Sequence, residues 1–149
     1  MHIEAWIQPV AVWTTHMRSE FIVVGGVLNA AFAVVHLMHW RLFNWREELR
    51  TLTFVNRGVV QILNLCLAFV FCIFAYVSLV HTDELTSSLL GYSLLALIAL
   101  FWLARAVQQI IFFRLRHWPS RALFLVFLVG ASLYGMPAVM MFWPRLAST

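Results

Sequence analysis

The chain has 149 residues, of which 63% are hydrophobic and only 11% are charged, and its formal net charge is +4. Its mean hydropathy is +0.88. Soluble domains carry about 25% charged residues, so this composition excludes an ordinary soluble domain and predicts an integral membrane protein.

The N-terminal segment, residues 1–20, is predicted to lie at the membrane surface. Trp6 and Trp13 would sit at the level of the lipid headgroups, as interfacial tryptophans do. Pro9 argues against one continuous helix through this segment. Because no basic region precedes a short apolar run, the segment does not resemble a cleaved signal peptide.

Four long apolar runs follow in chain order, and each reaches the length of about 20 residues that a helix needs to cross a hydrocarbon core about 30 Å thick. The predicted transmembrane helices cover residues 21–40, 54–80, 85–113 and 123–143. An isolated span in lipid must satisfy its own backbone hydrogen bonds, which favours α-helices. The second and third runs are longer than required, so we expect them to tilt or to extend beyond the lipid.

The connections between these runs cover residues 41–53, 81–84 and 114–122. Connections this short place successive helices antiparallel and side by side. The sequence has no internal repeat and no flexible linker. It therefore predicts one domain, residues 1–149, with an all-α fold: an antiparallel bundle of four transmembrane helices.

Capping and breaking residues refine the helix ends. Thr82 and Asp83 are positioned to cap the third transmembrane helix. Pro119 and Ser120 begin the fourth, since proline is tolerated in a first turn. Pro137 lies inside the fourth helix and should kink it near its outer end.

Small residues indicate where helices approach closely. Gly26, Ala30 and Ala33 form one stripe on the first helix, and Ala131 and Gly135 form another on the fourth. Packing within one bundle and a dedicated dimer face both explain such stripes.

The distribution of arginine predicts the orientation, because all ten basic residues are arginines. Eight lie in or beside the first and third connections: Arg41, Arg46, Arg50, Arg57, Arg105, Arg114, Arg116 and Arg121. Only Arg18 and Arg145 lie toward the other side, where the second connection carries Asp83 and Glu84. The positive-inside rule then places both termini on the non-cytoplasmic side, and the short arginine-only loops favour a bacterial inner membrane. The basic charge suits anionic membrane lipids and does not indicate nucleic-acid binding.

The second helix opens with the stretch NRGVVQILN, which is unusually polar for a membrane span. Arg57, Gln61 and Asn64 are spaced i, i+4, i+7 and share one helix face. That face should point into the bundle, because an amide facing lipid would lack hydrogen-bond partners.

Two other helices carry polar groups at comparable depths. On the third helix, Arg105 shares a side with Gln108 and Gln109, and the first helix offers Asn29 and His36. No Asp or Glu lies within the four runs to neutralise the arginines, and a buried arginine normally faces a partner or a water-filled cavity. The sequence therefore predicts a cytoplasm-facing, ligand-binding pocket lined by Arg57, Gln61, Asn64, Arg105, Gln108, Gln109, His36 and Asn29.

A purely structural reading of the same residues stands beside this one. The arginines could extend to the headgroups, or pair with Glu47 or Glu48 of the first connection. The amides could join transmembrane helices without binding any ligand.

Metal binding and catalysis are not predicted. His36 and His39 have a spacing compatible with a metal, but two ligands do not complete a site. His81 is expected at the opposite membrane face from His36, which argues against a haem held by two histidines. Cys66 and Cys72 are expected to behave as small hydrophobic residues. No catalytic motif is present, and the sequence assigns no cofactor.

Three functions remain compatible with these features. The first is a non-enzymatic module that binds an anionic small molecule or a lipid headgroup in the basic pocket. The second is a structural or accessory subunit of a larger membrane complex, with a protein partner or further copies of itself. The third is a small transporter or a membrane-embedded enzyme that uses the same pocket.

Overall fold

The computed structural model describes residues 4–146, with side chains described for residues 16–140. This part of the chain is helical and contains no β-strand. Its elements are α1 (Glu4–Leu37), α2 (His39–Leu42), α3 (Trp45–Glu48), the 3-10 helix η1 (Leu49–Thr51), α4 (Phe54–Val80), α5 (Thr82–Ser87), α6 (Leu89–Phe113) and α7 (Trp118–Leu146).

Four helices are long and apolar enough to cross a membrane, and the qualifying stretches are His16–Leu37, Phe54–Val80, Leu89–Phe113 and Trp118–Met140. The sequence predictions of an all-α fold and of four transmembrane helices are confirmed. The chain is therefore a multi-pass membrane protein.

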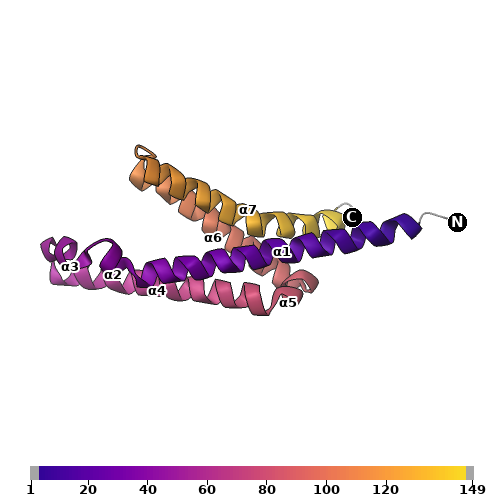
Figure 1. Ribbon diagram of the computed structural model, residues 1–149, viewed down its shortest axis with the longest axis horizontal. Coiled ribbons are helices and arrows are strands. Elements are labelled where there is room, and N and C mark those ends of the chain that lie inside the picture. The colour runs from indigo at the N-terminus through magenta and orange to yellow at the C-terminus, as the bar shows by residue number, and fades with distance from the viewer. Residues whose placement is uncertain (1–3, 147–149) are drawn as a thin grey trace.

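The four long helices form two antiparallel hairpins (Figure 1). Helix α1 packs along α4, and α6 packs along α7, while contacts of α1 with α7 and α5 join the hairpins. In Figure 1 the two hairpins diverge toward the end that carries α2, α3 and the turn between α6 and α7. The end of α7 and α5 lie toward the other end, and the start of α1 projects beyond both.

Helix α1 is longer than predicted, because it runs from Glu4 to Leu37 without a break at Pro9. The expected interruption is wrong. Pro9 stands near the start of the helix, where its missing N–H deprives only the Ala5 carbonyl of a helical partner. Whether residues 1–20 lie at the membrane surface stays a prediction, and the side chains of Trp6 and Trp13 fall outside the described residues.

The third transmembrane helix begins later than predicted, at Leu89, because the chain is extended at Ser88. The Ser88 hydroxyl accepts a hydrogen bond of 2.9 Å from the Gly91 amide, so Ser88 is the cap and the prediction for Thr82 and Asp83 is wrong. Thr82 and Asp83 instead begin the separate short helix α5. A Cβ on Gly91 would lie 2.5 Å from the Glu84 carbonyl oxygen, so only glycine lets α5 fold back so closely.

The fourth transmembrane helix starts at Trp118, earlier than predicted, with Pro119 in its first turn as expected. Figure 1 shows α7 changing direction where its colour passes from orange to yellow. Pro137, inside α7, cannot donate a hydrogen bond to the Leu133 carbonyl, and this missing bond allows the helix to bend. The bend brings the end of α7 alongside α1.

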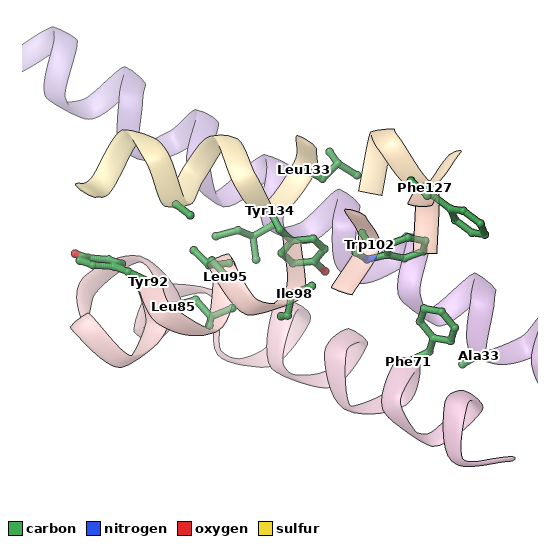
Figure 2. Close-up of a cluster of buried hydrophobic side chains, with 13 residues drawn as sticks. Ala33, Phe71, Leu85, Tyr92, Leu95, Ile98, Trp102, Phe127, Leu133 and Tyr134 are labelled. Atoms are coloured by element: carbon green, nitrogen blue, oxygen red, sulfur yellow. The ribbon is translucent and has the colours of Figure 1, made fainter. Parts of the chain in front are cut away.

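One ring from each long helix forms the centre of the fold, which we call the aromatic junction: Phe32 of α1, Phe71 of α4, Trp102 of α6 and Phe127 of α7. Trp102 is fully buried, and its ring centroid lies 5.0 Å from that of Phe32, 5.5 Å from that of Phe71 and 5.8 Å from that of Phe127. Figure 2 shows three of these rings, those of Phe71, Trp102 and Phe127, beside Tyr134. The aromatic junction is therefore where the two hairpins meet.

Glycines set how closely the helices approach. A Cβ on Gly26 would lie 2.8 Å from the Leu79 side chain, so the predicted stripe on α1 faces α4 of the same chain. On α7 the close approach occurs at Gly130, against the indole of Trp102, and Gly135 has ordinary space around it. The α1 stripe thus serves packing within one chain, and Gly130 was not singled out from the sequence.

Candidate functional site

The eight residues predicted to line one pocket are distributed over several hydrogen-bonded groups. Three of these groups join helices, one fixes a connection, and one contains a charge without an acidic partner. Gln61 is half-buried, and its side chain has no hydrogen-bond partner among the residues that the structure describes. In the orientation predicted from the sequence, the Val80 end of α4 is the outer end, and the end that carries α2 and α3 is the inner end.

Asn29 belongs to a buried network near the outer end of α4. Its amide nitrogen donates to the Gly25 carbonyl at 2.8 Å and to the Tyr134 hydroxyl at 2.7 Å. The Tyr134 hydroxyl is hydrogen-bonded to that of Ser78 at 2.8 Å. This network joins α1, α7 and α4, and the prediction that Asn29 shares a pocket with the arginines receives no support. Tyr134 was not noticed in the sequence because a single tyrosine in an apolar helix carries no pattern.

His36 and Asn64 form a reciprocal pair between α1 and α4. The Asn64 amide nitrogen donates to the His36 carbonyl at 2.8 Å, and the Asn64 side-chain oxygen lies 2.8 Å from His36 Nδ1. Because the His36 carbonyl can only accept, the Asn64 amide nitrogen must face it, and the Asn64 side-chain oxygen must face the His36 ring. That oxygen is an acceptor, so His36 Nδ1 must carry the proton. The lone pair of the neutral ring is therefore on Nε2.

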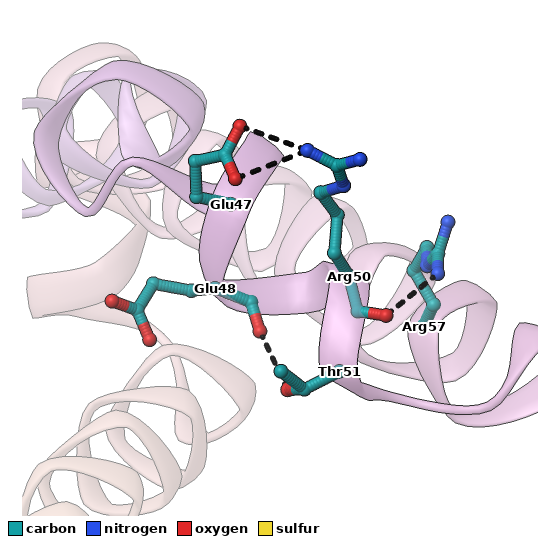
Figure 3. A network of polar contacts seen from close by, with 5 residues as sticks. All are labelled: Glu47, Glu48, Arg50, Thr51 and Arg57. Carbon is teal, nitrogen blue, oxygen red and sulfur yellow. Dashed lines mark hydrogen bonds and ion pairs between the residues drawn. The ribbon is translucent and has the colours of Figure 1, made fainter.

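Arg57 holds the first connection against the start of α4 (Figure 3). Its Nε donates to the Leu49 carbonyl at 3.0 Å, and its Nη2 donates to the carbonyls of Arg50 at 3.3 Å and Leu52 at 3.4 Å. These carbonyls lie in η1 and just after it, and the Leu49 carbonyl also accepts a hydrogen bond of 3.2 Å from the Leu52 amide. Glu47 pairs with Arg50 at 3.3 Å and not with Arg57. The expectation that Arg57 and Arg105 face one cavity is therefore not supported by this geometry.

The two glutamines of α6 have different partners. Gln109 is buried, and its amide nitrogen donates to the Ser120 hydroxyl at 2.9 Å, which fixes the start of α7 against α6. Gln108 is exposed, and its amide oxygen accepts a hydrogen bond of 2.8 Å from Nη1 of Arg105. Only Gln108 therefore has a direct role at an arginine.

Arg105 is a half-buried charge inside an apolar helix. It lies about 12 Å from the end of α6 at Phe113, at about 1.5 Å of rise per residue. Its guanidinium carbon stands 5.3 Å from the centroid of the Phe127 ring. Its Nε is buried and has no hydrogen-bond partner, and no carboxylate of the described residues pairs with it. One N–H group of this permanent charge therefore lacks an acceptor.

Arg105 and His36 lie on the same side of the aromatic junction, in opposite hairpins. Arg105 follows Trp102 by one helical turn, and His36 follows Phe32 by one turn. The His36 ring centroid lies 5.3 Å from that of Phe71, and the Arg105 guanidinium carbon lies 5.3 Å from that of Phe127. We call His36 and Arg105, with their hydrogen-bond partners Asn64 and Gln108, the inner junction. These are four of the eight predicted residues, two from each hairpin.

The inner junction offers complementary chemistry. The guanidinium edge of Arg105 supplies N–H donors and a positive charge, and Nε2 of His36 supplies an acceptor. Hydrogen bonds from a guanidinium to carboxylate or phosphate are short, strong and often bidentate. Within the described ranges no group of three or more His, Cys, Asp or Glu residues is placed to hold a metal ion.

No protein-family profile matches the chain, and no curated protein sequence or solved structure matches it significantly. The geometry of the inner junction is therefore the basis for a functional assignment.

Proposed function

We propose that this multi-pass membrane protein binds an anionic group at the inner junction, carried by a lipid headgroup or by a small soluble anion. The observation that supports the proposal is that Arg105, a permanent charge within an apolar helix, has no acidic partner and an Nε without an acceptor among the described residues. Such a charge is costly in a membrane span unless it has a partner. An anion held there would supply the missing counter-charge.

The two arginines of the predicted pocket differ in a way that supports this assignment. Arg57 donates to three backbone carbonyls of the first connection, so its guanidinium is largely occupied. Arg105 has one amide acceptor, Gln108, and one aromatic face, that of Phe127. Arg57 therefore has a structural role, and Arg105 is the residue that binds the anion.

Replacing Arg105 with glutamine tests the proposal. A hydrogen bond to a charged group contributes about 1.5–3 kcal/mol, so Arg105→Gln should weaken binding about 10- to 100-fold. The measurement is native mass spectrometry of the full chain in detergent, titrated either with phosphatidylglycerol or with inorganic phosphate. Retention of the lipid alone identifies a headgroup as the source, and retention of phosphate identifies a soluble anion.

Two matched variants serve as controls. Arg46→Gln changes an exposed arginine of the first connection and should leave binding unchanged. Arg57→Gln should lower thermal stability, because three backbone carbonyls lose a donor, while binding persists. Equal affinity of wild type and Arg105→Gln, or no binding of either anion to the wild type, would contradict the proposal.

We also propose the orientation in which the inner junction opens toward the cytoplasm and both termini lie outside. Eight of the ten arginines lie in or beside the first and third connections, which supports this orientation. In a Cys66→Ser, Cys72→Ser background, a cysteine at Asp83 should react with an impermeant thiol reagent applied to intact cells. A cysteine at Glu48 should react only after the cells are permeabilised. The reverse pattern would overturn this orientation.

A further inference from the structure

The hydrogen-bonding capacity of His36 determines which class of anion the inner junction would prefer. Its Nδ1–H donates a hydrogen bond of 2.8 Å to the side-chain oxygen of Asn64. The Asn64 amide nitrogen in turn donates to the His36 backbone carbonyl. The ring therefore cannot rotate to present Nδ1 without breaking its hydrogen bond to Asn64. In its neutral form it offers a ligand one acceptor, Nε2, and no donor.

The faces of the His36 ring are occupied as well. It stacks on His39, with ring centroids 4.5 Å apart and planes 9° apart, and on Phe71 at 5.3 Å. His39 is held in turn by its Nδ1, which donates to the Val35 carbonyl at 2.8 Å. Only the edge of the His36 ring that carries Nε2 is left for an interaction.

A ligand that satisfies both parts of the inner junction needs an anionic oxygen for Arg105 and a proton to share with His36. A phosphomonoester has both, because its second pKa is about 6 and its phosphate carries an ionisable hydroxyl near neutral pH. A phosphodiester has the charge but no such hydroxyl, and an ionised carboxylate only accepts. We infer that the inner junction selects a phosphomonoester over a phosphodiester, an inference that rests on the proposed function.

The experiment compares two lipids with the same acyl chains: phosphatidic acid, a phosphomonoester, and phosphatidylmethanol, a phosphodiester without a hydroxyl. Binding to the full chain in detergent is measured by native mass spectrometry. One additional hydrogen bond to a charged group predicts about a tenfold preference for phosphatidic acid. Glycerol 3-phosphate, the same headgroup without acyl chains, should compete if the natural ligand is soluble, and should fail to compete if it is a lipid.

Two substitutions at His36 separate ligand recognition from packing. The amide nitrogen of asparagine can take the place of Nδ1, so His36→Asn keeps a donor toward Asn64 and removes the outward acceptor. A glutamine amide reaches the place of Nε2, so His36→Gln keeps an outward acceptor and loses the bond to Asn64. We expect His36→Asn to bind both lipids equally and His36→Gln to retain a preference for phosphatidic acid.

The outcomes are distinguishable. A full preference for phosphatidic acid in His36→Asn, or equal binding of both lipids by the wild type, overturns the phosphomonoester inference while binding that depends on Arg105 still stands. If neither lipid nor inorganic phosphate binds the wild type, the proposed function itself fails. A purely structural role for His36 predicts the opposite order, with His36→Gln impaired more than His36→Asn, since His36→Gln breaks the bond to Asn64.

Discussion

Trp102→Ala is expected to destabilise the folded protein by about 3–5 kcal/mol, the usual cost of truncating a large buried aromatic residue. The indole is fully buried and contacts a ring from each of the other three long helices. Removing it would leave a cavity at the point where the two hairpins meet. Steric trapping of the purified protein in bicelles measures this free energy of unfolding.

Trp118→Ala is the matched control, because the same truncation is made at a position with 77% of the residue surface exposed, at the start of α7. Surface changes of this kind usually alter stability by less than about 0.5 kcal/mol. A similar loss of stability in both variants would show that the aromatic junction does not hold the hairpins together.

The four transmembrane helices could be predicted from the sequence because lipid leaves the backbone almost no alternative to a helix. The interruption at Ser88 was not predicted because the third apolar run was taken to begin at Leu85 and so included Thr86, Ser87 and Ser88. The local signal was the serine three residues before Gly91, a capping pattern that the apolar run concealed. The cap was predicted at Thr82 and Asp83 instead, since these are also good capping residues.

The candidate site was predicted only in part. Periodicity correctly assigned Asn64 to an inward face, and it was found opposite His36. Periodicity fixes the faces of one helix, however, and says nothing about the angle between hairpins. The hairpins diverge at their inner end, and the carbonyls that bind Arg57 belong to a connection whose fold the sequence pattern did not reveal. Arg57 and Arg105 were therefore combined in one pocket from the helix faces that they share with other polar residues and from their depth.

Gly130→Ala is expected to destabilise the protein by about 1–3 kcal/mol, as overpacking of a filled core does. A Cβ at this position would lie 2.5 Å from Cδ2 of the Trp102 indole, a rigid fused ring held by its neighbours. The helix would have to move away from α6, or the indole would have to leave its place among the other rings. The free energy of unfolding, again from steric trapping, reports the change.

Two other glycines provide controls, and a double substitution tests the cause of the effect. Gly58 has open space where a Cβ would stand, and at Gly135 the nearest atom would be 3.7 Å away. Alanine at either position should be neutral or stabilise the helix by up to about 1 kcal/mol. In a Trp102→Ala background the added methyl group of Gly130→Ala would enter the cavity, so its cost should disappear and the two substitutions should be strongly non-additive. Additive losses would show that Gly130 is required for a reason other than its contact with Trp102.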